Sequence, residues 1–270
     1  MNQVSVSTSS PLNQGSIGSV GSIKRDALAV YLATLLEIER FRDYCPNGLQ
    51  VEGKPEISSI VTAVSANAEV LEQAFAKGAD ALLVHHGYFW KNEDGRITGT
   101  RKQRIARVLQ HDLNLFGFHL PLDAHPTLGN NVQLAQRLQI IPDGQLASEA
   151  LVWHGRLEVE QTLEVFARQI EQTLQRPPLV IGAPQQPIRT IAWCTGGAQS
   201  YFEAAVAAGV DVYLTGEISE QHYHLARESG VAFIAAGHHA TERYGIQALG
   251  QHLADKFGLA HQFIDSDNPV

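Results

Sequence analysis

Seven side chains that can bind metal ions or move protons follow short apolar runs in this chain. They are His85 and His86 after "ALLV", His119 and Asp123 after "LNLFGF", Glu217 after "VYLT", and His238 and Glu242 after "VAFIAAG". Apolar runs of this length are typical of buried β-strands. Because functional groups in open α/β sheets gather beyond the carboxyl ends of the strands, we expect these side chains to form one site.

The chemistry that these residue types indicate is metal binding. His238 and Glu242 are four residues apart at the start of "HATERYGIQALGQHLADKF", which predicts an amphipathic helix with both side chains on one face. Imidazoles and carboxylates suit zinc, iron, manganese or nickel better than magnesium or calcium. A catalytic zinc takes three protein ligands. The candidates therefore suffice for two divalent ions, about 3.5–4 Å apart and bridged by a carboxylate.

The adjacent histidines have two interpretations. Gly87 lets the backbone turn after the strand, so His85 and His86 can converge on one site, one for each ion. Alternatively, His85 caps the strand and His86 makes a hydrogen bond in the core. The matching groups at the other strand ends favour metal binding.

Other residues have less decided roles. Glu217 and His119 are candidates to move a proton, or to orient a metal ligand instead. His125 is a candidate to support Asp123. The loop "CTGGAQ" from Cys194 is able to hold a phosphate at a helix start, but it lacks the lysine of a Walker loop, and a tight turn is the favoured interpretation. The aromatic run at residues 88–90 forms either core or, as we favour, a wall for a flat ring.

The elements that must position these residues alternate between strand and helix. An amphipathic helix is expected from Lys24, and β-type and helical runs alternate after it, which indicates an α/β fold with largely parallel sheets and helices on both faces. The expected organisation is a disordered tail over residues 1–22, a first lobe over 23–145 and a second over 146–270. The last strand is able to return to the first lobe.

The two lobes are expected to be similar, with the metal site between them. The stretch "VTAVSANAEVLEQAFAKGADALLVHHG" from Val61 aligns without a gap on "AWCTGGAQSYFEAAVAAGVDVYLTGEI" from Ala192. In this alignment Asp80 falls on Asp211. The polar groups correspond in three pairs: His86 with Glu217, His119 with His238, and Asp123 with Glu242, while His85 has Gly216 opposite it.

Composition narrows the class of protein. The chain has 20 basic and 28 acidic residues, a net charge of −8, which disfavours nucleic acid as a partner but not a nucleotide. No apolar run approaches the roughly 20 residues of a membrane helix, and the N-terminus lacks the features of a secretory signal. Cys45 and Cys194 alone cannot build a disulfide framework. We therefore expect a cytoplasmic protein with no membrane partner.

Five motifs in order resemble the GTP cyclohydrolase 1 type 2 homologue family, also described as dinuclear metal-centre, Nif-like proteins. The motifs are "NGLQVEG", "LLVHHGYFW", "HLPLDAHPTLGNN", "TGEISEQ" and "GHHATER", and the likeness runs from Ile23 to "FIDSDNP". The length indicates the family's short form. The resemblance implies a metal pair between two α/β lobes and a ring-shaped homohexamer. It also implies a set of metal ligands, with Glu242 bridging: His85, His86, Asp123, His238 and Glu242.

The function that follows is a metal-dependent hydrolase acting on a nucleotide-like small molecule. The family name suggests hydrolytic opening of the GTP imidazole ring, giving formate and dihydroneopterin triphosphate. Two alternatives stay open at this point. One is hydrolysis of a phosphoester, for which paired metals are equally suited. The other is a non-catalytic, metal-binding regulatory hexamer.

Overall fold

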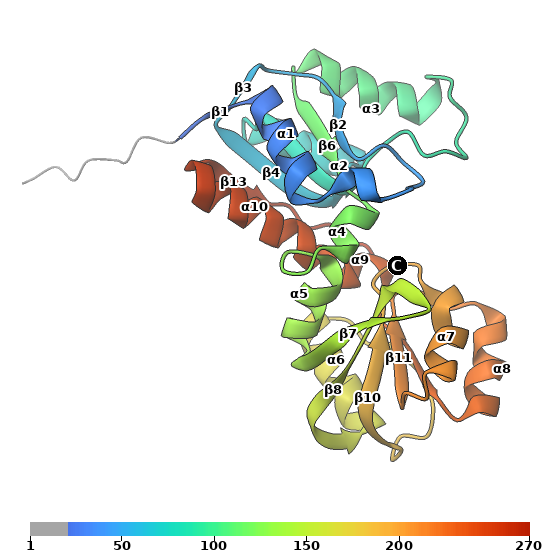
Figure 1. Cartoon of the computed structure of the whole chain (residues 1–270). Coiled ribbons are helices and arrows are strands. Elements are labelled where there is room, and N and C mark those ends of the chain that lie inside the picture. The colour runs from blue at the N-terminus through green and yellow to red at the C-terminus, as the bar shows by residue number, and fades with distance from the viewer. Residues whose placement is uncertain (1–20) are drawn as a thin grey trace, which may run out of the picture.

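The computed structural model describes residues 21–270, which form two α/β lobes joined by helices (Figure 1). A disordered tail was expected over residues 1–22, and residues 1–20 of it lie outside the described residues. Gly21 is held against the first lobe, because its N–H donates to the carbonyl of Gly258 at 2.8 Å. Within residues 21–270, no helix is both long and apolar enough to cross a bilayer.

The first lobe is built on a five-stranded sheet that is mostly parallel. Its strand order is β13 (Ala260–Phe263), β4 (Ser59–Ser65), β5 (Ala81–His86), β6 (Asn114–Gly117) and β2 (Gly48–Val51). All neighbours are parallel except β2 and β6. A small antiparallel pair, β1 (Ile23–Lys24) and β3 (Glu56–Ile57), lies beside it. Strands β4 and β5 are almost continuously buried, as expected for parallel strands covered on both faces.

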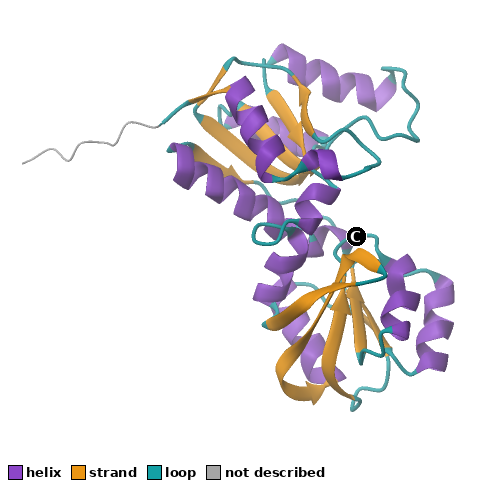
Figure 2. Cartoon of the chain, in the orientation of Figure 1, coloured by secondary structure: helices purple, strands orange, loops and turns teal. Residues whose placement is uncertain are grey.

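Helices cover both faces of this sheet (Figure 2). On one face, α2 (Ala68–Ala76) and α3 (Gly99–Gln110) place residues such as Leu71 and Val108 in the core. On the other face, α1 (Arg25–Leu35) and α10 (Arg243–Phe257) contribute buried residues to the core. A short 3-10 helix, η1 (Ile38–Arg40), follows α1. A fully buried leucine such as Leu32 contributes about 1.5–3 kcal/mol.

The end of the chain belongs to the first lobe. Strand β13 pairs with β4, from Ala260 opposite Ser59 to Phe263 opposite Thr62. In Figure 1 the red C-terminal elements accordingly lie beside the blue N-terminal ones. Helix α10 packs below the first sheet, so the chain crosses from the second lobe to the first immediately before α10.

The second lobe is built on a six-stranded mixed sheet. Its order is β7 (Ile140–Leu146), β8 (Glu149–Thr162), β10 (Pro187–Trp193), β11 (Val212–Thr215), β12 (Ala232–Ala235) and β9 (Leu179–Ile181). Only β10–β11 and β11–β12 are parallel. The α/β fold is confirmed, while the parallel pairing expected of both sheets predominates only in the first. One antiparallel pair arises because β7 and β8 are joined by a two-residue connection, and β8–β10 and β12–β9 are antiparallel too.

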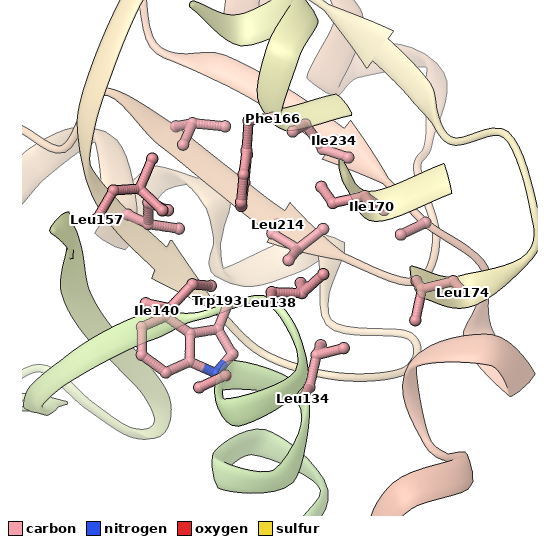
Figure 3. Packing of buried hydrophobic residues seen from close by; sticks show 14 of the residues in the cluster. Leu134, Leu138, Ile140, Leu157, Phe166, Ile170, Leu174, Trp193, Leu214 and Ile234 are labelled. Carbon is pink, nitrogen blue, oxygen red and sulfur yellow. The ribbon is translucent and has the colours of Figure 1, made fainter. Parts of the chain in front are cut away.

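Helices α5 (Asn130–Arg137) and α6 (Leu163–Leu174) cover one face of this sheet, and η2 (Gln199–Tyr201), α7 (Phe202–Ala207) and α8 (Glu220–Ser229) cover the other. Figure 3 shows the first of these interfaces, where Phe166 and Ile170 of α6 approach Leu214 and Ile234 of the sheet. Helix α6 begins after Thr162, whose side chain accepts the N–H of Val165.

The two sheets share an internal repeat. Strands β4, β5 and β6 are neighbours in that order, as are β10, β11 and β12. Asp80 and Asp211, which the sequence alignment pairs, have the same role. Asp80 accepts the N–H groups of Ser58 and Ser59 at 3.0 Å, and Asp211 accepts those of Arg189 and Thr190 at 2.9 and 2.8 Å. Partial burial raises the pKa of each carboxyl, but hydrogen bonds outweigh it and lower the pKa: that of Lys54 and then the backbone N–H groups for Asp80, and the backbone N–H groups for Asp211.

We predict that Asp211→Ala lowers the free energy of unfolding by about 1–3 kcal/mol at pH 7, because two backbone donors at the start of β10 lose their acceptor. The folded-state pKa of Asp211 is depressed. Its contribution is therefore present above about pH 4 and is lost as the pH falls through the folded-state pKa. Urea unfolding of the metal-free protein at pH 7 and pH 3 measures both effects.

The control is Asp255→Ala, which removes an exposed carboxylate of α10 bonded only to Gln251 among the described residues. It should change stability by less than about 0.5 kcal/mol. Equal losses in the two variants, or a loss for Asp211→Ala that does not shrink at pH 3, would contradict the assigned role.

Candidate metal centre

The structure brings all seven predicted side chains together where the two lobes meet. His85 and His86 end β5, His119 follows β6, and Asp123 lies on the short helix α4 (Leu120–Ala124). From the second lobe, Glu217 follows β11, and His238 begins α9 (His238–Thr241), which is followed by Glu242. Each group is therefore placed by the carboxyl end of a strand, as expected for an α/β site.

The carboxylate of Glu242 lies at the middle of the site. Its Oε1 is 3.3 Å from Nε2 of His85, and its Oε2 is 3.3 Å from Nε2 of His86 and 3.1 Å from Nε2 of His238. His85 Nε2 is also 3.5 Å from Oδ1 of Asp123. Four three-residue sets of possible ligands result among the described residues; two of them contain Glu242 and the other two contain His119. We call His85, Asp123 and Glu242 the inner group, and His86, His238 and Glu242 the outer group.

The two groups differ in their access to solvent. The side chain of His85 is fully buried, and those of Asp123 and Glu242 are 9% and 3% exposed. In the outer group, His86 and His238 are 20% and 29% exposed. The outer group therefore faces the opening of the site, and the inner group forms its floor.

Two buried atoms in this site lack a hydrogen-bond partner. Nε2 of His85 and Oε2 of Glu242 are both shielded from solvent, and neither forms a hydrogen bond with the described part of the chain. Leaving a buried polar atom unpaired costs about 1–3 kcal/mol, and more for a charged group. Both atoms point toward the space that the ligands surround, so the donor set fits a bound cation.

The second ring nitrogen of each histidine is occupied, which fixes how the ring faces the site. Nδ1 of His85 lies 2.8 Å from the carbonyl of Phe118, and Nδ1 of His86 lies 3.1 Å from Oγ of Ser65. Nδ1 of His238 lies 2.6 Å from Oε1 of Glu217. All three Nε2 atoms are thereby directed at Glu242, the arrangement found behind metal-binding histidines.

His119 is held in the same way by Asp43. Its Nδ1 is 2.7 Å from Oδ1 of Asp43, whose Oδ2 also accepts the N–H of Leu120 and the amide of Asn47. Burial raises the pKa of Asp43, but these hydrogen bonds outweigh it and hold the pKa at about 2. The sequence analysis missed Asp43, because it lies in an irregular stretch, "FRDYCPNG", without a spacing relation to His119.

The charges of the site favour a cation. Burial alone would lower the pKa of His85, but Asp123 and Glu242 raise it to about 10. Burial likewise opposes protonation of His238, while Glu242 and Glu217 raise its pKa to about 9. The pKa of Glu242 is lowered well below its usual value, since the surrounding imidazoles outweigh its burial. Positive charge is thus stabilised at His85 and His238, whereas burial and the neighbouring imidazoles lower the pKa of His86 to about 3.

The glycine loop after β10 forms one wall of the site. Gly196 has φ of +71°, and a Cβ there would lie 2.0 Å from Oε1 of Glu242. A Cβ on Gly197 would lie 3.3 Å from Oε1 of Glu217. The sequence analysis interpreted "CTGGAQ" as a tight turn. The structure adds that Gly196 must lack a side chain for Glu242 to occupy its position.

The expected continuous helix from His238 is interrupted. Helix α9 ends at Thr241, Glu242 has non-helical torsions, and α10 begins at Arg243. The hydroxyl of Thr241 lies 2.9 Å from the carbonyls of both Gly237 and His238, a local bond that competes with helix continuation. His238 and Glu242 still meet, at 3.1 Å.

His125 and most of the aromatic run at residues 88–90 lie away from the metal ligands. His125 accepts the N–H of Leu128 and makes no hydrogen bond with Asp123, so it does not support that ligand. Tyr88 and Phe89 pack in the first-lobe core, whereas the ring of Trp90 lies 6.0 Å from that of His86 and 5.0 Å from that of His119. Of the aromatic run, Trp90 alone borders the site.

The sequence pattern of the family described as Duf34/NIF3 (NGG1p interacting factor 3) matches residues 23–269. The chain belongs to the Duf34/NIF3 family. A Neisseria meningitidis relative named GTP cyclohydrolase 1 type 2 homolog is 53% identical over 248 residues, covering 92% of this chain and 99% of the relative. A Pseudomonas aeruginosa relative of the same name is 50% identical, covering 90% of this chain and 100% of the relative.

Solved structures agree with this membership. A structure described as protein ybgI, of unknown function, is 47% identical with a TM-score of 0.89, covering 92% of this chain and 100% of that protein. A Thermus thermophilus protein is 33% identical with a TM-score of 0.82, at coverages of 92% and 100%. The Duf34/NIF3 fold therefore extends over the described residues of this chain almost completely.

We predict that Glu217→Gln weakens metal binding about 10- to 100-fold, because the charged partner that orients His238 is lost. Competition with a fluorescent chelator measures the affinity. The matched control is Glu220→Gln, which should leave the metal affinity unchanged. Glu220 forms an exposed ion pair with His224, four residues away, just as His238 and Glu242 are four residues apart. Equal affinities for Glu217→Gln and the unaltered protein would contradict a role for Glu217 in orienting His238.

Proposed function

We propose that this chain binds two divalent metal ions and is a metal-dependent hydrolase of a nucleotide. The inner group would hold one ion, the outer group the other, and Glu242 would bridge them. The observation that carries the proposal is the sharing of Glu242 by two three-residue groups around buried, unpartnered atoms. The mixture of imidazoles and carboxylates suits zinc, iron, manganese or nickel.

The names of the relatives support the type of reaction. Proteins about half identical to this chain over nearly their whole length are named GTP cyclohydrolase 1 type 2 homolog. We therefore propose ring-opening hydrolysis of the GTP imidazole as the first reaction to test, with formate as the product that identifies it. The family resemblance also leads us to propose a homohexamer, which light scattering of the purified protein tests.

Bound divalent ions would supply Lewis acidity that activates water and polarises the bond under attack. The chain itself would contribute position and proton transfer. The ring nitrogens of His85, His86 and His119 lie within 4.8 Å of one another, so His119 faces the reaction space while Asp43 holds its Nδ1. His119 is thus the better candidate to move a proton. Glu217 is engaged by Nδ1 of His238, which suits a positioning role.

Trp90 would contribute to substrate binding. Its ring stands beside His86 and His119, and its Nε1 donates to the carbonyl of Gly87 at 3.2 Å, which fixes the ring. A purine that stacked on this ring would lie against the outer group, on the side of the site that is open to solvent.

We predict that Glu242→Gln reduces the metal content from two ions per chain to less than one, because both groups lose their shared carboxylate. Elemental analysis measures the content, and circular dichroism checks that the variant is folded. Glu220→Gln, the control on an exposed helix, should keep both ions. One ion or none in the unaltered protein would overturn the dinuclear proposal.

The reaction is tested by loading the purified protein with defined metals and supplying GTP and other nucleotides. We expect metal-dependent formate release, and a decrease of about 10²- to 10⁴-fold in kcat for His119→Asn at unchanged metal content. Release of free phosphate instead would identify a phosphoester hydrolase. No turnover with any nucleotide would leave the non-catalytic metal-binding assembly as the function.

A further inference from the structure

A second polar pocket lies next to the metal centre, between the end of α6 and residues 265–269. Its volume is about 520 Å³, and its polar lining includes Arg176, His239, Arg243, Asp265 and Asn268. None of these residues is among the seven of the metal centre. The pocket is formed by segments of both lobes, since α6 covers the second sheet and residues 265–269 follow β13 of the first.

Arg176 in this pocket has no anionic partner. Its guanidinium forms no hydrogen bond or ion pair with any of residues 21–270, and its Nη1 is shielded from solvent. The guanidinium is placed there by two features of the backbone. Gln175 ends α6 in the left-handed conformation, and Gly237 leaves the space for Nη1, since a Cβ there would lie 1.8 Å from it. An unpaired, partly buried guanidinium is costly, and an anion would satisfy it.

Arg243 provides a second guanidinium in the lining of the pocket. Its Nη1 is 3.0 Å from Oδ2 of Asp265 and its Nη2 donates to the carbonyl of Leu174 at 2.8 Å, so the side chain is fixed. Its Nε is buried and has no partner within the described residues. Asp265 is also 2.8 Å from Nε2 of His239. This carboxylate is therefore engaged and does not neutralise Arg176.

The pocket adjoins the metal centre. A smaller pocket of about 160 Å³ is lined by His86 and His238 of the outer group, and it shares His239 and Asn268 with the larger one. Gly237, against which Arg176 lies, immediately precedes His238. A ligand bound at the outer group can thus extend past His239 toward Arg176.

We propose that the pocket around Arg176 and Arg243 binds the phosphate groups of the substrate whose base reaches the metal centre. This inference rests on the proposed function and adds a subsite to it. Guanidinium groups bind phosphate oxygens through paired, charge-assisted hydrogen bonds, which suits a polyphosphate better than a neutral ligand. The carboxylates of Asp265 and Asp267 both line the pocket and are the charges that oppose the anion.

The test compares the binding of GTP and guanosine to the protein as purified, by calorimetry. We expect GTP to bind more tightly, and Arg176→Gln to weaken GTP about tenfold or more while leaving guanosine unchanged. Asp267→Asn should tighten GTP binding, because it removes an opposing charge. The matched control is Arg168→Gln, which changes an exposed arginine of α6 that is paired with Glu164.

The outcomes separate this inference from the proposed function. If GTP affinity depends on Arg176 but no nucleotide is hydrolysed, the subsite stands and the hydrolase proposal fails. If GTP is hydrolysed and Arg176→Gln binds it as tightly as Arg168→Gln does, the subsite is overturned. Equal weakening of GTP and guanosine by Arg176→Gln overturns it too, because the effect would then not involve the phosphates. Melting temperatures of both variants show that the fold is kept.

Discussion

The buried carboxylate of Glu242 is the constraint on which the site depends. It is 3% exposed and is surrounded by Nε2 atoms of three histidines at 3.1–3.3 Å, yet its Oε2 has no hydrogen bond among the described residues. A carboxylate removed from water is costly unless a cation compensates it. The hydrogen bonds behind the histidines direct all three rings at this one group, so the site is organised around the carboxylate of Glu242.

The same residue marks the crossing between the lobes. Glu242 lies between α9, which follows a strand of the second sheet, and α10, which packs below the first sheet. The inner group takes His85 and Asp123 from the first lobe, and the outer group takes His238 from the second. Ligands from both lobes therefore meet on a carboxylate at their junction, and the spacing of the lobes fixes the spacing of the ligands.

The internal repeat explains both the symmetry and the asymmetry of the site. Aligned strands end on aligned polar groups, and Asp80 and Asp211 anchor equivalent turns. However, His85 aligns with Gly216, whose missing side chain leaves room for the backbone of His238. One lobe thus contributes an additional imidazole and the other provides the space for a close approach.

The sequence by itself determined the α/β class, the repeat and the seven residues at strand ends, because strand periodicity and residue type are local properties. It could not reveal Asp43 behind His119, Gly196 against Glu242, or Arg176 beside Gly237, since these contacts join segments without a spacing relation. It also predicted one helix from His238, where Thr241 ends α9. Tertiary structure alone decided the mixed second sheet, and it decided the return of the last strand, which the sequence had only allowed, because strand pairing depends on packing across the whole chain.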